Sequence, residues 1–156
     1  MIVDGYNVIH AWRLDTSPLE DAREALLHVL DDFAGYSGEN ITVVFDGYQT
    51  KTEASEYAHG LITVVFTAYG VTADTHIQRM VKAASAISRR RLKVVTADYL
   101  EQLSVFEAGA MRMTPAELKL YIDAAREKHV DLIHRDSLEG KALKTRLKRD
   151  AVSKPE

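Results

Sequence analysis

The 156-residue sequence contains no cysteine. This absence excludes a disulfide framework, a thiolate metal site and a cysteine nucleophile, so a bound metal would need oxygen or imidazole ligands. A chain without cysteine suits a reducing compartment, and we expect a cytoplasmic protein. The sequence also lacks an apolar run of the roughly 18 residues that span a membrane, and its N-terminus lacks the pattern of a secretory signal. We therefore expect no membrane association.

Several catalytic motifs are absent as well. The sequence has no glycine-rich phosphate loop, no G-x-S-x-G elbow and no dinucleotide-binding fingerprint. These absences disfavour a nucleotide-dependent kinase, a serine hydrolase and a dehydrogenase. The six histidines do not show the H-E-x-x-H spacing of a zinc protease. Carboxylates are the remaining candidates for chemistry.

The composition is that of a globular protein with one core, because 46% of the residues are hydrophobic and 28% are charged. The charge is unevenly distributed. Residues 1–133 hold 13 Lys and Arg against 19 Asp and Glu, whereas residues 134–156 hold 7 against 4. We predict one globular domain over 1–133 and a basic C-terminal helical tail over 134–156 that can meet an anion such as nucleic acid. A solvated helix without a partner is the alternative.

Apolar runs alternate with segments of helical periodicity along the chain. The predicted strands cover residues 1–3, 41–45, 61–66, 92–95 and 110–113, and the predicted helices cover 18–34, 74–88, 99–108, 115–129 and 136–149. Residues 47–60 are predicted to form a long polar connection. The alternation predicts an α/β fold with a parallel sheet covered by helices on both faces. Ligands of such sheets bind beyond the carboxyl ends of the strands.

Three aspartates follow predicted strands, and a fourth opens a predicted helix. They are Asp4, Asp46, Asp98 and Asp74. Because the carboxyl ends of parallel strands share one edge of a sheet, we expect the four side chains to lie near one another. Carboxylates that crowd together repel, and a bound Mg²⁺ or Mn²⁺ would relieve the repulsion and support phosphodiester hydrolysis. Asn7, one turn beyond Asp4, is expected to orient an aspartate or a metal-bound water.

Each aspartate also has a purely structural interpretation. Asp-Gly after an apolar run is a common turn signal, which applies to Asp4 and Asp46. Asp74 has the position of an acid in the first turn of a helix, and Asp98 that of an N-cap. Their joint occurrence at one predicted edge keeps the metal site open beside these interpretations.

Five motifs follow one another along the chain, namely Val3-Asp4-Gly5-Tyr6-Asn7-Val8-Ile9, Val43-Val44-Phe45-Asp46, Val64-Val65-Phe66-Thr67, Thr72-Ala73-Asp74-Thr75 and Val94-Val95-Thr96-Ala97-Asp98. As an ordered series over about residues 1–130 they closely resemble the YacP-like group of NYN domains, which is related to PIN-domain nucleases. The resemblance implies a PIN-like three-layer α/β/α fold with a mainly parallel central sheet and an acidic metal site that cuts RNA. It also implies that Asp4, Asp46, Asp74 and Asp98 occupy the family's acidic positions and that Asn7 is the polar residue of its opening motif.

Members of this group include ribosome-associated endonucleases that cleave mRNA. The resemblance therefore implies RNA, in particular mRNA, as the substrate, and it makes the ribosome a candidate partner of the basic tail. The chain departs from the family pattern at two points. The family usually has a few more residues before the first aspartate, and serine is common where this chain has Ala97. Neither departure removes an aspartate.

RNA binding requires contacts to bases and phosphates. In the polar connection, Tyr48 is the first candidate for stacking on an unpaired base, and Tyr57 is the second. The candidate phosphate contacts are Lys51, Lys141, Lys144, Arg146, Lys148 and Arg149. The leading hypothesis is a metal-dependent endoribonuclease with Mg²⁺ or Mn²⁺ at the four aspartates. The alternatives are a non-catalytic RNA- or ribosome-binding module with the same fold and a phosphotransfer domain that carries an aspartyl phosphate.

Overall fold

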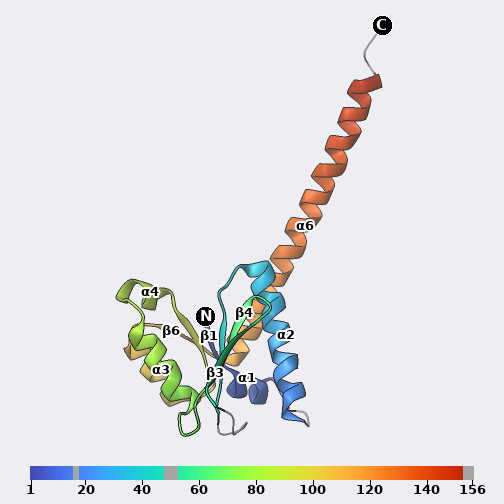
Figure 1. The fold of residues 1–156 in the computed structure, drawn as a ribbon. Coiled ribbons are helices and arrows are strands. Elements are labelled where there is room, and N and C mark those ends of the chain that lie inside the picture. The colour runs from blue at the N-terminus through green and yellow to red at the C-terminus, as the bar shows by residue number, and fades with distance from the viewer. Residues whose placement is uncertain (16–17, 48–52, 153–156) are drawn as a thin grey trace.

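A central β-sheet organises the computed structural model, which describes residues 1–15, 18–47 and 53–152 (Figure 1). The strands are β1 (Ile2–Asp4), β2 (Thr42–Phe45), β3 (Ser55–His59), β4 (Ile62–Phe66), β5 (Lys93–Val95) and β6 (Met111–Met113). The helices are α1 (Gly5–Ala11), α2 (Leu19–Ser37), α3 (Ala73–Ala83), α4 (Ala86–Arg91), α5 (Tyr99–Glu107) and α6 (Pro115–Val152). Side chains are described as far as residue 148.

The strand order is β3-β4-β2-β1-β5-β6, and every neighbouring pair is parallel except β3 with β4. The chain builds β2 and β4 on one side of β1 and then crosses to build β5 and β6 on the other side. The sheet thus reverses its direction of growth at β1. In open parallel sheets the carboxyl edge beside such a reversal is the usual place for a ligand.

Helices cover both faces of the sheet. On one face α1, α2 and the first turns of α6 pack together, with Phe33 and Leu118 fully buried. On the other face α3 and α5 form a second core that includes Ile77 and Val105. Successive residues of a strand point to opposite faces, so the apolar strands contribute to both cores. The predicted three-layer α/β/α fold with a mainly parallel central sheet is confirmed.

Two local predictions are wrong. The polar connection predicted over 47–60 contains β3, an edge strand whose first four residues are exposed. Such a strand needs no apolar alternation, so its sequence does not look like a strand. The single helix predicted over 74–88 is divided, because Ala84 is extended and Ser85 caps α4 by accepting a hydrogen bond from the Ser88 N–H at 3.2 Å.

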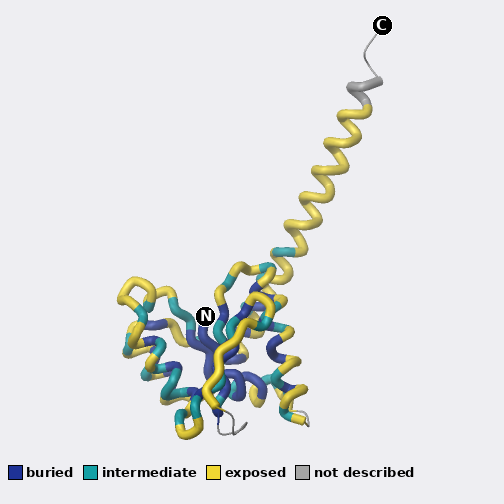
Figure 2. Tube along the Cα trace, viewed as in Figure 1, coloured by how far each residue is buried: buried dark blue, intermediate teal, exposed yellow. Residues whose placement is uncertain are grey.

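The last helix, α6, is continuous over 38 residues where two segments were predicted. Its start is the predicted capping box: the Thr114 N–H donates to Glu117 Oε2 at 2.7 Å, and the Glu117 N–H donates to the Thr114 hydroxyl at 3.1 Å. From residue 130 to residue 148 every side chain is exposed, and the helix extends away from the sheet (Figure 2). The boundary at 133 remains a prediction, because the helix runs through it. None of the helices in the described ranges is long and apolar enough to cross a membrane.

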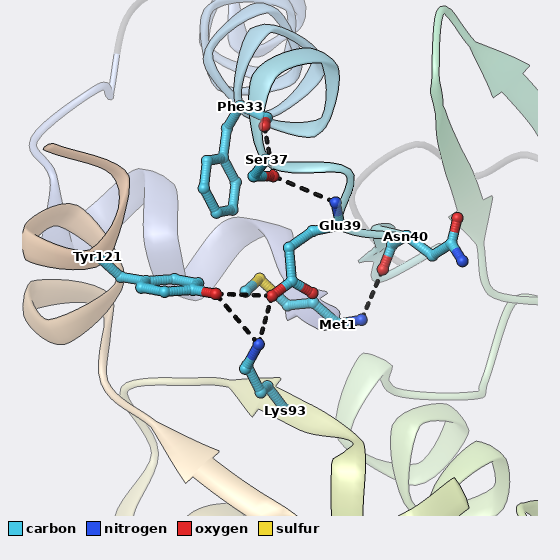
Figure 3. A network of polar contacts seen from close by, with 7 residues as sticks. All are labelled: Met1, Phe33, Ser37, Glu39, Asn40, Lys93 and Tyr121. Atoms are coloured by element: carbon cyan, nitrogen blue, oxygen red, sulfur yellow. Dashed lines mark hydrogen bonds and ion pairs between the residues drawn. The ribbon is translucent and has the colours of Figure 1, made fainter. Parts of the chain in front are cut away.

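Polar side chains at the amino edge of the sheet fix α6 to β5 and to the segment after α2 (Figure 3). The Lys93 ammonium pairs with the Glu39 carboxylate, to which the Tyr121 hydroxyl also donates at 2.8 Å. Burial alone would raise the pKa of Glu39, but the hydrogen bonds from Lys93 and Tyr121 outweigh it and lower the pKa. Beside this group, the Met1 amino group donates to the Asn40 carbonyl at 2.6 Å. The exposed half of α6 therefore leaves the molecule at the edge opposite the carboxyl ends of the parallel strands.

Candidate active site

Asp4 lies at the centre of the carboxyl edge, where it is both the last residue of β1 and the N-cap of α1. The helix can follow the strand directly because Gly5 has no side chain: a Cβ there would lie 2.2 Å from the Phe45 ring. Gly47, two residues beyond β2, is similarly constrained, since a Cβ would lie 2.0 Å from the carbonyl oxygen of Thr67. Both Asp-Gly pairs thus mark close packing at the strand ends.

Asp4 is buried, with only 5% of the residue exposed. Its Oδ1 accepts a hydrogen bond from the backbone N–H of Asn7 at 3.2 Å, and its Oδ2 accepts one from the Asn7 side-chain amide at 2.9 Å. Burial raises the pKa of Asp4 to about 6; the hydrogen bonds from Asn7 oppose this shift, and the negative charges of Asp74 and Asp46 add to it. A nearby cation would lower the cost of ionising this group.

The Asn7 side chain connects the end of β1 to the segment that follows β5. While its side-chain nitrogen donates to Asp4, its side-chain oxygen accepts a hydrogen bond from the backbone N–H of Ala97 at 3.2 Å. The second contact uses the backbone, which alanine supplies as well as serine does. The departure from the family pattern at Ala97 therefore leaves this connection intact.

Asp98 is the N-cap of α5, as its structural interpretation required. Its Oδ1 accepts hydrogen bonds from the N–H groups of Leu100 at 2.8 Å and Glu101 at 3.2 Å. The residue is exposed at the carboxyl edge next to β5. Asp98 therefore caps α5 and also lies at the acidic edge.

Asp74 and Asp46 complete the acidic edge. Asp74 lies in the first turn of α3 and accepts a hydrogen bond from the Gln78 side-chain amide at 2.9 Å. Asp46 directly follows β2 and is half-buried. Since the charges of both residues act on Asp4, the structure brings them into its electrostatic neighbourhood.

Glu101 is a candidate site residue that the sequence analysis missed. It is 2% exposed, and its Oε2 accepts a hydrogen bond from the Thr96 hydroxyl at 2.6 Å. Its buried Oε1 has no hydrogen-bond partner in the part of the chain that the structure describes. Burial raises the pKa of Glu101 to about 8; the bond from Thr96 opposes the shift, and the charges of Asp4, Asp74 and Asp98 add to it. In sequence, Glu101 resembles an ordinary acid in the first turn of a helix, and only its burial distinguishes it.

The acidic side chains form one electrostatic group rather than a closed cage. Among the described residues, no three acidic or histidine side chains lie close enough to hold one ion between them. The group nevertheless combines two buried carboxyl groups of raised pKa with three further aspartates. Its oxygen atoms and negative charge are what hard divalent cations bind.

The structure separates the described tail cations from this edge. Tyr48 and Lys51 lie outside the described residues, and the side chain of Arg149 is not described either. The remaining candidates are exposed on the projecting half of α6, and they are Lys141, Lys144, Arg146 and Lys148. Tyr121 lies at the amino edge, and Lys141 follows it by twenty residues along α6. At the rise of an α-helix this is about 30 Å along the helix axis, away from the carboxyl edge. The tail cations therefore do not line the acidic edge.

The family model of the YacP-like NYN domain matches residues 1–156. The chain belongs to this family. A curated YacP-like relative, the uncharacterized protein YacP of Bacillus subtilis (strain 168), is 34% identical over 122 residues, which cover 76% of this chain and 71% of that protein. NYN domains are generally nucleases and have a PIN-like fold.

Solved structures of the YacP-like NYN family agree with the fold described above. The crystal structure of Rae1 (YacP) from Bacillus subtilis has 28% sequence identity and a TM-score of 0.69, and the match covers 97% of this chain and 88% of that one. A tryptophan-to-leucine mutant of the same protein gives 29% identity and a TM-score of 0.71, with 97% and 98% coverage.

Proposed function

We propose that the chain is a metal-dependent endoribonuclease that hydrolyses RNA phosphodiester bonds at the carboxyl edge of its sheet. The observation that carries this proposal is the burial of Asp4 and Glu101 next to three further aspartates on an NYN domain. Burying carboxyl groups together costs stability, and perturbed acids of this kind gather at functional sites. A purely structural role gives no reason for the unpartnered Oε1 of Glu101 within the described chain.

The proposed cofactor is Mg²⁺ or Mn²⁺ bound at the acidic edge, where Asp4, Asp46, Asp74 and Asp98 are the candidate ligands. The residues fit such an ion because their donor atoms are all oxygen. A cation would also favour the ionised form of Asp4 and so oppose the burial and the negative charges that raise its pKa. Mg²⁺ keeps several of its waters and binds only one or two protein carboxylates, so it does not need a closed cage of acids. When bound, the ion would supply an activated water and neutralise charge on the phosphate.

The chain's own side chains would position the reacting groups. Asn7 holds the Asp4 carboxylate through its amide and ties β1 to the start of α5 through Ala97. The burial of Asp4 shields its charge from water, which strengthens its attraction to a cation and to the groups that a cation orders. Asp98 is exposed to solvent, so an RNA strand could reach the acidic edge at this residue.

For the substrate we propose mRNA, with the ribosome as a partner in the cytoplasm. The family resemblance and the exposed cations of α6 support this proposal. Because those cations lie about 30 Å beyond the amino edge, they would hold RNA at a distance from the cleaved bond. Ribosomal RNA bound by the tail and mRNA cut at the opposite edge would fit this arrangement.

The nuclease proposal is tested with a variant that carries both Asp4→Asn and Asp98→Asn. The parent protein should cut single-stranded RNA with Mg²⁺ or Mn²⁺ and stop when the ion is chelated, and the double variant should not cut at all. Asp123→Asn, an exposed change on α6, is the matched control and should cut like the parent. Full activity of the well-purified double variant would overturn the proposal.

A non-catalytic ribosome-binding module is the second candidate, because the exposed cations of α6 are far from the acidic edge. Replacing Lys141, Lys144 and Lys148 by Gln separates the two. Loss of ribosome binding with retained cutting of free RNA supports the enzyme. Ribosome binding by the parent without cutting in any divalent metal supports the module.

A further inference from the structure

A groove of about 830 Å³ opens between the start of α2 and the β3–β4 hairpin. It is lined by Arg23 from α2, Tyr57 from β3 and Phe66 from β4. Tyr57 is a large aromatic residue that remains 43% exposed. Tyr57 was a candidate for base stacking from the sequence, but the groove was not predicted, because β3 itself was not predicted.

The groove adjoins the acidic edge. Phe66 is the last residue of β4, and its partner in the register is Phe45, which immediately precedes Asp46. Aromatic rings link the two places: Tyr6 lies 5.0 Å from Phe45, Phe45 lies 5.3 Å from Phe66, and Phe66 lies 6.4 Å from Tyr57, all between ring centroids. An RNA strand at the acidic edge would meet the groove one or two strands away.

Arg23 is held at this junction by contacts on two sides. Its Nη1 donates to the Tyr6 hydroxyl at 3.2 Å, and its guanidinium carbon lies 5.6 Å from the centroid of the Phe66 ring. Asp46 also acts on the Tyr6 hydroxyl through its charge. The cation is therefore oriented before any ligand binds, and it lies near both the groove and the acidic edge.

The charge of the groove favours a base over a phosphate. Among the described residues, three glutamates (Glu20, Glu24 and Glu53) and one cation (Arg23) line it. Their excess negative charge repels phosphate oxygens, whereas their carboxylates can accept hydrogen bonds from the amino group of a base. An exposed aromatic ring beside them offers a face for stacking, which is how proteins commonly bind unpaired bases.

We propose that this groove binds the unstacked base of an RNA nucleotide close to the cleaved phosphate. Tyr57 stacks on the base, and a groove glutamate accepts from its exocyclic amino group. Adenine, cytosine and guanine carry such a group and uracil does not, so the groove favours the first three. The assignment rests on the proposed function, because it is the nuclease reaction that brings an RNA strand to the neighbouring edge.

The test measures RNA binding by full-length protein that carries Asp4→Asn, which keeps the RNA intact. Labelled single-stranded oligonucleotides of alternating cytosine and adenine, or of uracil alone, are titrated by fluorescence anisotropy. Adding Tyr57→Ala should weaken binding of the cytosine–adenine RNA about tenfold, and Tyr57→Phe should retain it. Phe106→Ala, which removes an exposed aromatic ring from α5, is the control and should bind like Asp4→Asn alone.

Three outcomes overturn the proposal. The first is that the Asp4→Asn protein does not bind RNA, and the second is that adding Tyr57→Ala changes its Kd by less than about twofold. The third is that the Asp4→Asn protein binds the two oligonucleotides with equal affinity. Cleavage by the parent protein is measured separately, so the two proposals can fail independently. Cutting without an effect of Tyr57→Ala on binding refutes the groove and leaves the nuclease. Binding that depends on Tyr57, without cutting in any metal, supports the groove and refutes the nuclease.

Discussion

The side-chain amide of Asn7 donates to Oδ2 of Asp4 at 2.9 Å, and this bond is one half of a bridge across the acidic edge. The other half is the hydrogen bond from the Ala97 N–H to the Asn7 side-chain oxygen at 3.2 Å. One neutral side chain thus sets the orientation of the most buried aspartate and the position of the loop that leads to Asp98. The arrangement of the site depends on it.

Asn7→Ala should therefore reduce RNA cleavage more than it reduces stability. Loss of a residue that orients a metal ligand typically lowers activity or metal affinity about 10- to 100-fold, whereas loss of these hydrogen bonds should lower the free energy of unfolding by about 1 kcal/mol. Cleavage rates and urea denaturation measure the two effects. Asn40→Ala, an exposed change at the amino edge, is the control and should leave both unchanged. Equal cleavage by Asn7→Ala and the parent would show that Asn7 has no orienting role.

Asp4→Asn should stabilise the metal-free protein at pH 7. The pKa of Asp4 is about 6 in the folded protein against 3.8 for the free side chain, so between these values the folded state binds more protons than the unfolded state. The free energy of unfolding therefore falls as pH rises from about 4 to about 6, by on the order of 2 to 3 kcal/mol in all. Asparagine is neutral and can still cap α1, so the variant should lose this pH dependence. Urea denaturation from pH 4 to pH 7 in the presence of a chelator measures it.

Mg²⁺ or Mn²⁺ should reverse the difference in stability between Asp4→Asn and the parent protein. An ion that binds the folded state raises the midpoint of unfolding of the parent, and Asp4→Asn should show little of this increase. Unfolding midpoints with and without the ion supply a readout that does not depend on catalysis. A variant that the ion stabilises as strongly as the parent would contradict a role for Asp4 in metal binding.

Glu101→Gln should be tolerated, whereas Glu101→Leu should not. With a pKa of about 8, Glu101 is mainly protonated at neutral pH in the metal-free protein, and Gln has nearly the same shape. We expect a change within about 1 kcal/mol for Gln, but a loss of about 1 to 3 kcal/mol for Leu, because the buried Thr96 hydroxyl then loses its acceptor. Chemical denaturation distinguishes the two variants.

The same residue should release a proton when an ion binds. A cation near Glu101 favours its charged form, so calorimetry at pH 7 in buffers of different ionisation enthalpy should detect the release, and Glu101→Gln should reduce it. Identical proton release by the parent and Glu101→Gln would place Glu101 outside the influence of the ion.

Glu39→Gln should lower stability without affecting cleavage. It removes the charge that pairs with Lys93 at the amino edge, where the two side chains are 24% (Lys93) and 20% (Glu39) exposed. Because the pair is not fully buried, we expect a loss of about 1 to 2 kcal/mol at pH 7. The pKa of Glu39 is lowered by folding, so this contribution is present above pH 4.5 and is lost as pH falls through the folded pKa.

The control for this change is Glu107→Gln, which alters an exposed acid at the end of α5. Denaturation of the two variants at pH 7 and in acid measures the difference. If both unfold like the parent at pH 7, the network does not hold α6 to the sheet. Reduced cleavage by Glu39→Gln alone would instead reveal a coupling between the two edges.

The sequence determined the architecture of this protein and the place where its acids gather. Apolar runs with branched side chains specify strands that are covered on both faces, and helical periodicity between them makes those strands parallel. Since parallel strands end at one edge, residues at their ends or directly after them, such as Asp4 and Asp46, must share that edge. The capping box at Thr114 was likewise predictable because its hydrogen bonds join residues three positions apart.

Only the tertiary structure decided which side chains are buried at that edge and what lies beside it. Glu101 has the local pattern of a solvated helix acid, and its burial depends on the packing of α5 against β6 and α3. The groove at Tyr57 requires β3 to pair with β4 and α2 to pass alongside, and the direction of the basic helix depends on contacts between Tyr121 and Glu39. Such relationships join residues far apart in the chain, so no local pattern of residues encodes them.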